Sequence, residues 1–107
     1  MAVSEAHVDE LEPALQSGAR LIDVREIEEY QSGHVPGAVL VPLASVPHAL
    51  DRFAPGQTNY VICRTGARSY RACEFLIERG IDAVNVAGGT MAWITSGRDT
   101  VTGDLPA

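Results

Sequence analysis

Short apolar runs alternate with helical segments along this chain. The apolar runs are 19–23, 38–41, 59–63 and 83–86, and they have the length and the β-branched content of buried strands. The segments between and beside them that predict helices are 8–15, 26–30, 45–53, 70–79 and 91–95. Short strands alternating with helices are typical of a parallel sheet that is covered on both faces. The pattern therefore predicts an α/β domain.

Glycine, proline and serine mark the expected ends of several helices. Gly18 is expected to stop the first helix, although Pro13 should kink or split it. Ser69 has a side chain suited to the N-cap of helix 70–79, and Gly80 stands at the C′ position of that helix. These signals predict a strand, a short loop and a helix in direct succession between residues 59 and 79.

Size and composition fit one globular domain. The chain has 107 residues, of which 46% are hydrophobic and 21% charged, so we expect residues 1–107 to form a single domain with 97–107 as a polar C-terminal tail. The apolar run 38–41 is far too short to span a bilayer, and the first residues lack the features of a signal peptide. We therefore expect a cytoplasmic location.

The charge of the chain argues against two classes of partner. A formal net charge of −6 disfavours binding to nucleic acids and to anionic membranes, which both require a basic surface. The chain has no lysine, and three of its eight basic residues, Arg64, Arg68 and Arg71, lie within eight consecutive positions. Positive charge is therefore concentrated in one segment.

Cysteine and histidine usage narrows the chemistry further. The two cysteines, Cys63 and Cys73, are too few for a disulfide scaffold, and their spacing is not that of a redox or zinc motif. Thiols without disulfides suit a reducing compartment. Cys73 falls on the apolar face of the predicted helix, so we interpret it as a packing residue. His7, His34 and His48 are scattered without carboxylate partners, and no metal site is predicted.

The candidate site is the segment Cys63, Arg64, Thr65, Gly66, Ala67, Arg68 and Ser69. Because Cys63 ends a predicted strand just before a helix, backbone N–H groups and the positive end of the helix dipole are aimed at one point. Such a loop holds an anion and favours thiolate over thiol, and Arg64 and Arg68 act in the same direction. A free cysteine is more often a small buried hydrophobic residue. Gly66, which permits a positive φ, and the two arginines favour a reactive nucleophile here.

Asp23 and Arg25 are candidate supporting residues. Asp23 ends the run 19–23, and ligand sites of parallel sheets lie outside the carboxyl ends of the strands. Asp23 or Arg25 can then brace the Cys63 loop through charge-assisted hydrogen bonds. Equally, Asp23 can cap a helix that starts near Glu26. The sequence leaves both alternatives open.

Four segments of the chain carry the motifs of a known family. They are Leu21-Ile22-Asp23-Val24-Arg25-Glu26 with Glu29-Tyr30, then Gly33-His34-Val35-Pro36-Gly37-Ala38 with Val41-Pro42-Leu43, then the Cys63 loop, and lastly Gly88-Gly89-Thr90-Met91-Ala92-Trp93. Together they are specific, and with them the chain resembles a single-domain rhodanese, a sulfurtransferase. The resemblance implies a three-layer α/β fold, with a mainly parallel five-stranded sheet flanked by helices on both faces.

The resemblance also implies a reaction. Cys63 would take a sulfane sulfur from a small anionic donor such as thiosulfate or a related persulfide, become a persulfide itself, and pass the sulfur to cyanide or a thiol. Backbone N–H groups of residues 64–68 would cradle the persulfide, and Arg64 and Arg68 are candidates for donor binding. Thr65 and Ser69 offer hydroxyls to the anion or serve only turn and cap chemistry, which we favour for Ser69. No metal or organic cofactor is required.

Other functions and partners remain open at the level of sequence. Cysteine-based phosphatases and arsenate reductases use a C-x5-R loop, but only four residues separate Cys63 from Arg68, and the shorter ring suits a persulfide better. The chain can also act as a persulfide relay or binding module, and candidate protein partners are a thioredoxin-like protein or a desulfurase. We interpret Trp93 as a core residue and His34 as a hydrogen-bonded structural residue.

Overall fold

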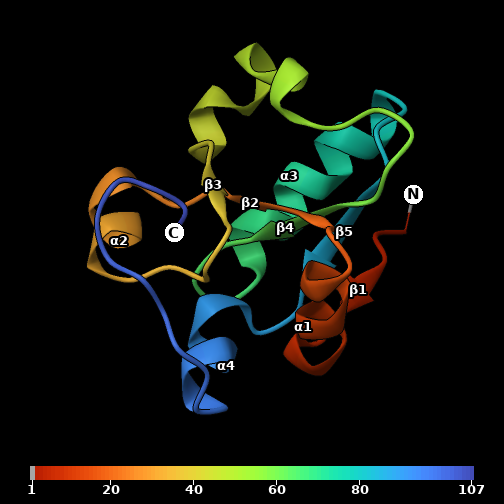
Figure 1. Cartoon of the computed structure of the whole chain (residues 1–107). Coiled ribbons are helices and arrows are strands. Elements are labelled where there is room, and N and C mark those ends of the chain that lie inside the picture. Colours follow the sequence, from red (N-terminus) through yellow and green to blue (C-terminus); the bar gives the residue numbers. More distant parts are fainter. Residues whose placement is uncertain (1) are drawn as a thin grey trace.

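The central feature of the structure is a parallel sheet of five strands (Figure 1). The computed structural model describes residues 2–107. The strands are β1 (Glu5–Ala6), β2 (Arg20–Asp23), β3 (Val39–Leu40), β4 (Asn59–Ile62) and β5 (Ala83–Val86), in the spatial order β1-β5-β4-β2-β3. All neighbouring pairs are parallel, which confirms the prediction. We did not predict β1, because a strand of two residues leaves no periodic pattern.

Helices cover both faces of the sheet, as predicted. The α-helices are α1 (Val8–Gln16), α2 (Ile27–Ser32), α3 (Ala67–Glu78) and α4 (Gly89–Thr95), and the 3-10 helices are η1 (Leu43–His48) and η2 (Leu50–Arg52). On one face, α1, α2 and α4 contribute Leu11, Tyr30 and Trp93 to a buried cluster. On the other face, α3 and η1 contribute Leu76 and Val46 to a second cluster. The structure therefore has three layers.

Alternate residues of the central strands β2 and β4 face opposite layers. Leu21 and Ile62 belong to the cluster of α1, α2 and α4, whereas Ile22 and Val61 belong to the cluster of α3, and all four are at most 2% exposed. Burial of one such side chain stabilises the fold by about 1.5–3 kcal/mol. A slip by one residue would exchange the two layers, so the register that pairs Asp23 with Ile62 at the strand ends is strongly specified.

Most helix ends lie within two residues of the prediction, but three helical segments differ from it in other ways. One helix, α1, runs through Pro13, where we expected a kink or a break. The segment expected as one helix at 45–53 forms two 3-10 helices, and Pro47 lies inside the first of them. The helix α3 begins at Ala67 with Gly66 as its N-cap, so the expected capping role of Ser69 is wrong. Gly66 adopts the left-handed conformation, with φ 111°, and this lets the turn close before Ser69 is reached.

The C-terminal segment packs beside α2. His34 and Val101 exchange two backbone hydrogen bonds of 2.9 Å, and the buried His34 ring faces the carbonyl oxygens of Tyr30 and Leu105 at 2.7 and 2.8 Å. Trp93 is 5% exposed. These contacts agree with a structural role for His34 and a core position for Trp93. They also show that the segment after residue 97 packs against the rest of the domain.

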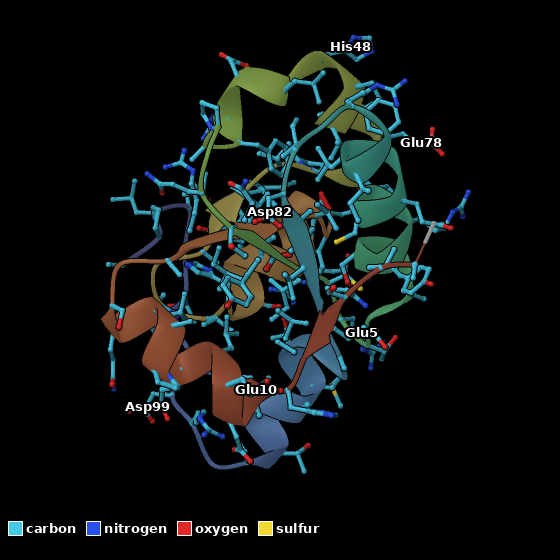
Figure 2. All side chains as sticks on the ribbon, turned by 90° about the vertical axis from the view of Figure 1, so that its right-hand side faces the viewer. Glu5, Glu10, His48, Glu78, Asp82 and Asp99 are labelled. Carbon is cyan, nitrogen blue, oxygen red and sulfur yellow. The ribbon has the colours of Figure 1, made fainter. Side chains whose placement is uncertain are left out.

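Acidic side chains are distributed over the outside of the molecule. Figure 2 labels Glu5, Glu10, Glu78, Asp82 and Asp99, which come from different parts of the chain, and all five are exposed. None of the helices within residues 2–107 has the length and apolar character needed to cross a membrane. Arg64 of the Cys63 loop is therefore an exposed cation on a chain whose net charge is negative.

The first residues of α4 hold the Cys63 loop in place by donating hydrogen bonds to the carbonyl groups of the loop. The Thr90 N–H and hydroxyl donate to the Cys63 carbonyl at 2.9 and 3.0 Å, and the Met91 N–H donates to the Arg64 carbonyl at 3.0 Å. This approach requires glycine at position 89, because a Cβ there would lie 2.5 Å from the Arg64 carbonyl oxygen. The backbones of the Cys63 loop and of the start of α4 are therefore in close contact.

Gly89→Ala is expected to lower the free energy of unfolding by about 2–4 kcal/mol, through left-handed strain and a backbone clash together. Gly97→Ala is the matched control, because Gly97 also has a positive φ, +85°, but nothing lies within 4 Å of its Cβ position. That variant should lose about 1 kcal/mol. Urea unfolding followed by circular dichroism measures both losses, and equal losses would contradict the close approach at Gly89.

Candidate functional site

The candidate nucleophile lies at the carboxyl edge of the sheet. Cys63 directly follows β4, which is the middle strand and is flanked by β2 and β5. The elements that follow β2 and β5 meet the Cys63 loop at this edge, where they contribute Glu29 and Thr90. Parallel α/β sheets bind their ligands at this edge.

Hydrogen-bond donors enclose the sulfur of Cys63. The Gly66 N–H donates to Sγ at 3.1 Å, and the Ser69 hydroxyl donates to it at 3.2 Å. Cys63 is only 1% exposed, so these donors take the place of water around the sulfur. The arrangement can stabilise a thiolate or another anion formed at the same point.

Gly66 gives the loop its shape. Its φ of 111° turns the chain into α3, and the side-chain amide of Asn85 donates to the Gly66 carbonyl at 3.1 Å. The first turn of α3 is therefore fixed next to Cys63, with its unpaired N–H groups on the side of the sulfur. Ser69 lies in this turn and uses its hydroxyl for Sγ instead of for a helix cap.

Burial and hydrogen bonding act on the Cys63 thiol in opposite directions. Burial raises its pKa, but the Ser69 hydroxyl and the backbone N–H groups of Ser69, Gly66 and Thr65 outweigh burial, and the pKa lies below its ordinary value. At Cys73 burial dominates and raises the pKa to about 12. The thiolate is therefore favoured at Cys63 and strongly disfavoured at Cys73.

A carboxylate of α2 holds Arg68. The Arg68 Nη1 and Nη2 donate to the two carboxylate oxygens of Glu29 at 2.7 and 2.9 Å, and this contact lowers the pKa of Glu29 to about 2. The two side chains are 35% and 31% exposed. The charge of the nearby Cys63 thiolate is among the causes that raise the pKa of Arg68. We expected Arg68 to bind the donor, and the structure pairs its guanidinium with Glu29.

The remaining side chains of the loop are open to solvent. Arg64, Thr65 and Ala67 are exposed. None of the ion pairs found within residues 2–107 includes Arg64. Thr65 acts on Cys63 through its backbone N–H, and Ala67 is the first residue of α3. Arg64 is therefore the cation of the loop that is available to a ligand.

Asp23 and Arg25 form a buried ion pair with each other. The Arg25 Nε and Nη2 donate to the Asp23 carboxylate at 3.0 and 2.8 Å, and Nη2 also donates to the Gly33 carbonyl at 2.9 Å. Glu26 is the N-cap of α2, so the expectation that Asp23 caps this helix is wrong. In the described part of the chain neither side chain hydrogen-bonds to the Cys63 loop. The two buried charges satisfy each other and fix the turn after β2.

Three residues that hold the loop were not identified as site residues from the sequence. Glu29 binds Arg68, Asn85 binds the Gly66 carbonyl, and Thr90 binds the Cys63 carbonyl. The sheet pattern predicts that segments after neighbouring strands meet at one edge, but it does not predict which side chains touch. Within residues 2–107, no three His, Cys, Asp or Glu side chains gather in a group that could hold a metal ion.

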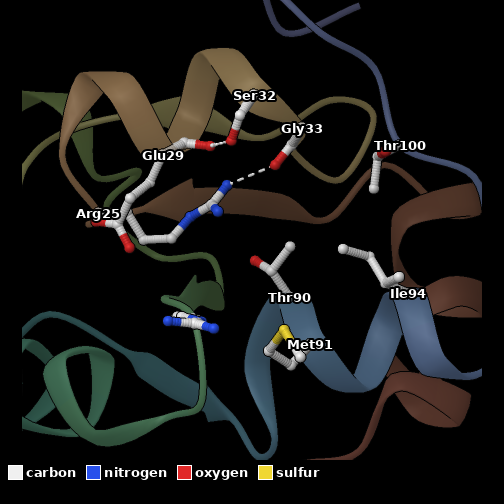
Figure 3. Close-up of a pocket in the computed structure, with 9 residues that line it drawn as sticks. Arg25, Glu29, Ser32, Gly33, Thr90, Met91, Ile94 and Thr100 are labelled. Atoms are coloured by element: carbon white, nitrogen blue, oxygen red, sulfur yellow. Dashed lines mark hydrogen bonds between the residues drawn. The ribbon is translucent and has the colours of Figure 1, made fainter.

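A cavity of about 320 Å³ adjoins the loop (Figure 3). Its lining residues are Arg25, Glu29, Ser32, Gly33, Arg64, Thr90, Met91, Ile94 and Thr100. They come from α2 and the residues that flank it, from α4, from the Cys63 loop and from the C-terminal segment, and they combine charged and hydroxyl groups with two apolar side chains. Ligand sites in proteins have volumes of about 300–1,000 Å³, so this one suits a small molecule.

Comparison with known proteins agrees with this geometry. The family model described as "Rhodanese-like domain" matches residues 7–96. The chain is 42% identical over 73 residues to YtwF of Bacillus subtilis, covering 68% of this chain and 71% of that protein. It is 31% identical over 74 residues to the thiosulfate sulfurtransferase GlpE of Pseudoalteromonas translucida, covering 68% of this chain and 70% of that protein.

Solved structures show the same relationship. The crystal structure of a rhodanese-like domain protein from Staphylococcus aureus matches with a TM-score of 0.80 at 38% sequence identity, and the match covers 85% of this chain and 91% of that one. The five-stranded parallel sheet, the cysteine loop after its middle strand and the match over residues 7–96 lead to one conclusion. The chain belongs to the rhodanese-like domain family.

Proposed function

We propose that this chain is a sulfurtransferase that moves a sulfane sulfur from thiosulfate or a related persulfide donor to cyanide or a thiol, with Cys63 as the carrier. The observation on which the proposal depends is the buried Cys63 sulfur, to which the Gly66 N–H and the Ser69 hydroxyl donate. These donors suit a nucleophilic thiolate, and they suit the anionic persulfide that it becomes.

In the first half of the reaction, the Cys63 thiolate attacks the outer sulfur of thiosulfate. A bond forms between Sγ and that sulfur while the S–S bond of thiosulfate breaks, and sulfite leaves with the bonding electron pair. The product is a Cys63 persulfide, which the donors of the loop stabilise as an anion. This half of the reaction is balanced in atoms and electrons, and it requires no metal or organic cofactor.

In the second half, cyanide or a thiolate attacks the outer sulfur of the persulfide. The S–S bond breaks, its electron pair returns to Sγ, and thiocyanate or a new persulfide leaves. Because Cys63 is 1% exposed, the surrounding protein limits the access of water to the intermediate. A reducing compartment such as the cytoplasm keeps the thiol available for the next cycle.

The charges of the loop favour an anionic donor. Arg64 is exposed and can contact thiosulfate and the sulfite that leaves, whereas Arg68 is paired with Glu29. The positive charge of Arg68 offsets the Glu29 carboxylate, so that this carboxylate does not repel an anion that approaches the loop. Asp23 and Arg25 act indirectly, by fixing the turn that leads from β2 into α2.

The length of the loop favours sulfur transfer over phosphate chemistry. Only four residues separate Cys63 from Arg68, one fewer than in a phosphatase loop, and the shorter ring suits a persulfide better than a bound phosphate. A persulfide relay uses the same intermediate as the enzyme, and it differs only in requiring a protein partner, such as a thioredoxin-like protein or a desulfurase, for turnover.

Thiosulfate is expected to add the mass of one sulfur atom to the intact chain. Cys63→Ser should abolish the addition because it removes the nucleophile, whereas Cys73→Ala should leave it, since burial raises the pKa of Cys73 to about 12. Alanine is used at position 73 because a serine hydroxyl would be left unpartnered in the core. Intact-mass spectrometry measures all three proteins.

Two outcomes would overturn the proposed reaction. One is sulfur addition that survives Cys63→Ser. The other is hydrolysis of a phosphotyrosine analogue at a rate comparable to thiosulfate turnover. Continued formation of thiocyanate over many turnovers separates an enzyme from a relay, because a relay loads once and then waits for its partner.

Arg68→Ala is expected to lower kcat/KM for thiosulfate by about tenfold, or about 1.4 kcal/mol, because it removes a cation of the loop and leaves the Glu29 carboxylate unpaired, where it repels an anionic donor. Arg98→Ala is the matched control, since Arg98 also bridges acidic side chains, Asp9 and Glu12, but outside the Cys63 loop. Steady-state thiocyanate formation measures both variants. Equal losses would show that the anion binds elsewhere.

A further inference from the structure

We propose that Glu5 and Asn85 are positioning residues for the Cys63 loop, and that Asn85 serves the loop with no gain in the stability of the fold. This inference rests on the proposed function, because the loop that it concerns is the one that would carry the sulfur. It adds a carboxylate of the N-terminal strand β1 to the groups that support the nucleophile.

Asn85 connects the sheet to the residue that faces the nucleophile. It lies in β5, is 1% exposed, and its Nδ2 donates to the Gly66 carbonyl at 3.1 Å. The N–H of Gly66 donates to the Cys63 Sγ, also at 3.1 Å. Glycine has more backbone freedom than any other residue, so a contact that fixes its carbonyl also restricts the direction of its N–H. Asn85 therefore helps to aim a donor at the sulfur without touching the sulfur itself.

Glu5 fixes the side-chain amide of Asn85. The two residues face each other in the parallel pair of β1 and β5, and Nδ2 donates to the Glu5 Oε2 at 2.8 Å. Both hydrogens of the amide nitrogen are then used, one toward Glu5 and one toward the Gly66 carbonyl. The flipped amide is excluded, because its oxygen would face a carboxylate and a carbonyl. The bond to the carboxylate is charge-assisted and is therefore the stronger of the two.

This arrangement leaves the amide oxygen of Asn85 unpaired. No N–H or O–H group of residues 2–107 donates to Oδ1, although the atom is buried. A buried oxygen without a donor lowers the stability of a fold. An apolar side chain of similar size would remove that penalty, since the Gly66 carbonyl would still accept from the Tyr70 N–H at 3.1 Å and the exposed Glu5 would face water. The contribution of Asn85 is therefore to the loop and not to the stability of the sheet.

Asn59 is the opposite case in the neighbouring strand β4. It is 0% exposed, and its Oδ1 accepts from the Ala54 N–H at 2.9 Å. Its Nδ2 donates to the backbone carbonyls of Ala54, Gln57 and Asp82. Each polar atom of this amide is paired, and the residue begins β4, whereas the nucleophile follows the end of β4. Asn59 therefore has a structural role and is a matched control for Asn85.

The charge of Glu5 by itself would act against a nearby thiolate. This charge is among the causes that raise the pKa of Cys73 in α3. If Glu5 acted on Cys63 only through its charge, removing it would make the Cys63 thiolate form more easily. If Glu5 acts by holding Asn85, removing it makes the thiolate form less easily. The two roles therefore predict shifts of opposite sign.

The test compares the ionisation of the Cys63 thiol with the stability of the fold. In a Cys73→Ala background, ultraviolet absorbance of the thiolate gives the midpoint of ionisation, and circular dichroism in urea gives the midpoint of unfolding. Asn85→Val should raise the ionisation midpoint by about 0.5–1 pH unit, because it weakens one hydrogen bond to the thiolate. Its urea midpoint should be unchanged or higher. Asn59→Val should leave the ionisation midpoint unchanged and lower the urea midpoint.

Sulfur loading from thiosulfate should follow the ionisation. At a pH below both ionisation midpoints, Asn85→Val should load about threefold to tenfold more slowly, which is the loss of thiolate that the shift implies. The difference should shrink as the pH rises and the thiol ionises in both proteins. A change that only loosened the fold would not depend on pH in this way. Intact-mass spectrometry at several pH values measures the loading rates.

Glu5→Ala should also raise the ionisation midpoint, by a smaller amount than Asn85→Val. The double variant should show no further rise, because Glu5 acts through Asn85. Asp82→Ala is the matched control and should leave the midpoint unchanged. Asp82 is an exposed acid that directly precedes β5, and it accepts a hydrogen bond from the Thr58 hydroxyl at 3.0 Å (Figure 2).

Three results would overturn the positioning role. The first is an ionisation midpoint that Asn85→Val leaves unchanged or lowers. The second is a loss of stability in Asn85→Val as large as that in Asn59→Val, or a failure of Asn85→Val to fold. The third is a midpoint that Glu5→Ala leaves unchanged or lowers, or an effect of Glu5→Ala that adds to that of Asn85→Val. The proposed function fails separately, if the unmodified chain takes up no sulfur from thiosulfate, since the ionisation shifts are measured without a donor.

Discussion

The site depends on a balance between burial and hydrogen bonding at one sulfur atom. Cys63 is 1% exposed, and burial alone would hold it as a neutral thiol. Donors from the first turn of α3 and the Ser69 hydroxyl reverse this preference and lower its pKa. Cys73 lies within the same helix layer, and its pKa is raised to about 12 by burial. The two cysteines therefore differ in reactivity because only one of them faces the N–H groups of a helix start.

The rest of the domain holds that helix start in place. Asn85, in β5, binds the Gly66 carbonyl, and Thr90, in α4, binds the Cys63 carbonyl. Glu29, from α2, holds the side chain of Arg68. These residues come from elements that follow or belong to the strands on either side of β4, so the parallel sheet brings them to one edge (Figure 1). The geometry of the Cys63 site therefore depends on strand order as much as on the loop sequence.

Local patterns were sufficient to predict the layers and the loop, and insufficient to predict how its side chains pair. The layers follow from the alternation of apolar residues in β2 and β4, and the loop follows from the Gly66 turn after Cys63. Each of these signals lies within a few consecutive residues. Ser69 was misassigned because its role depends on where α3 begins, and Gly66 moved that start toward the N-terminus. The contact between Glu29 and Arg68 joins residues that are 39 positions apart, and the cavity has walls from four segments, so neither leaves a local signal.

The most direct test is a pH titration of the Cys63 thiolate, followed by its ultraviolet absorbance in a Cys73→Ala background. We expect the folded thiol to ionise at a lower pH than the same thiol in the urea-unfolded chain, because the folded state adds donors to the thiolate. The thiolate would then be present at pH values where an unfolded cysteine is still protonated, and Ser69→Ala should move the midpoint upward. A folded midpoint at or above that of the unfolded chain would contradict a nucleophile stabilised by the loop.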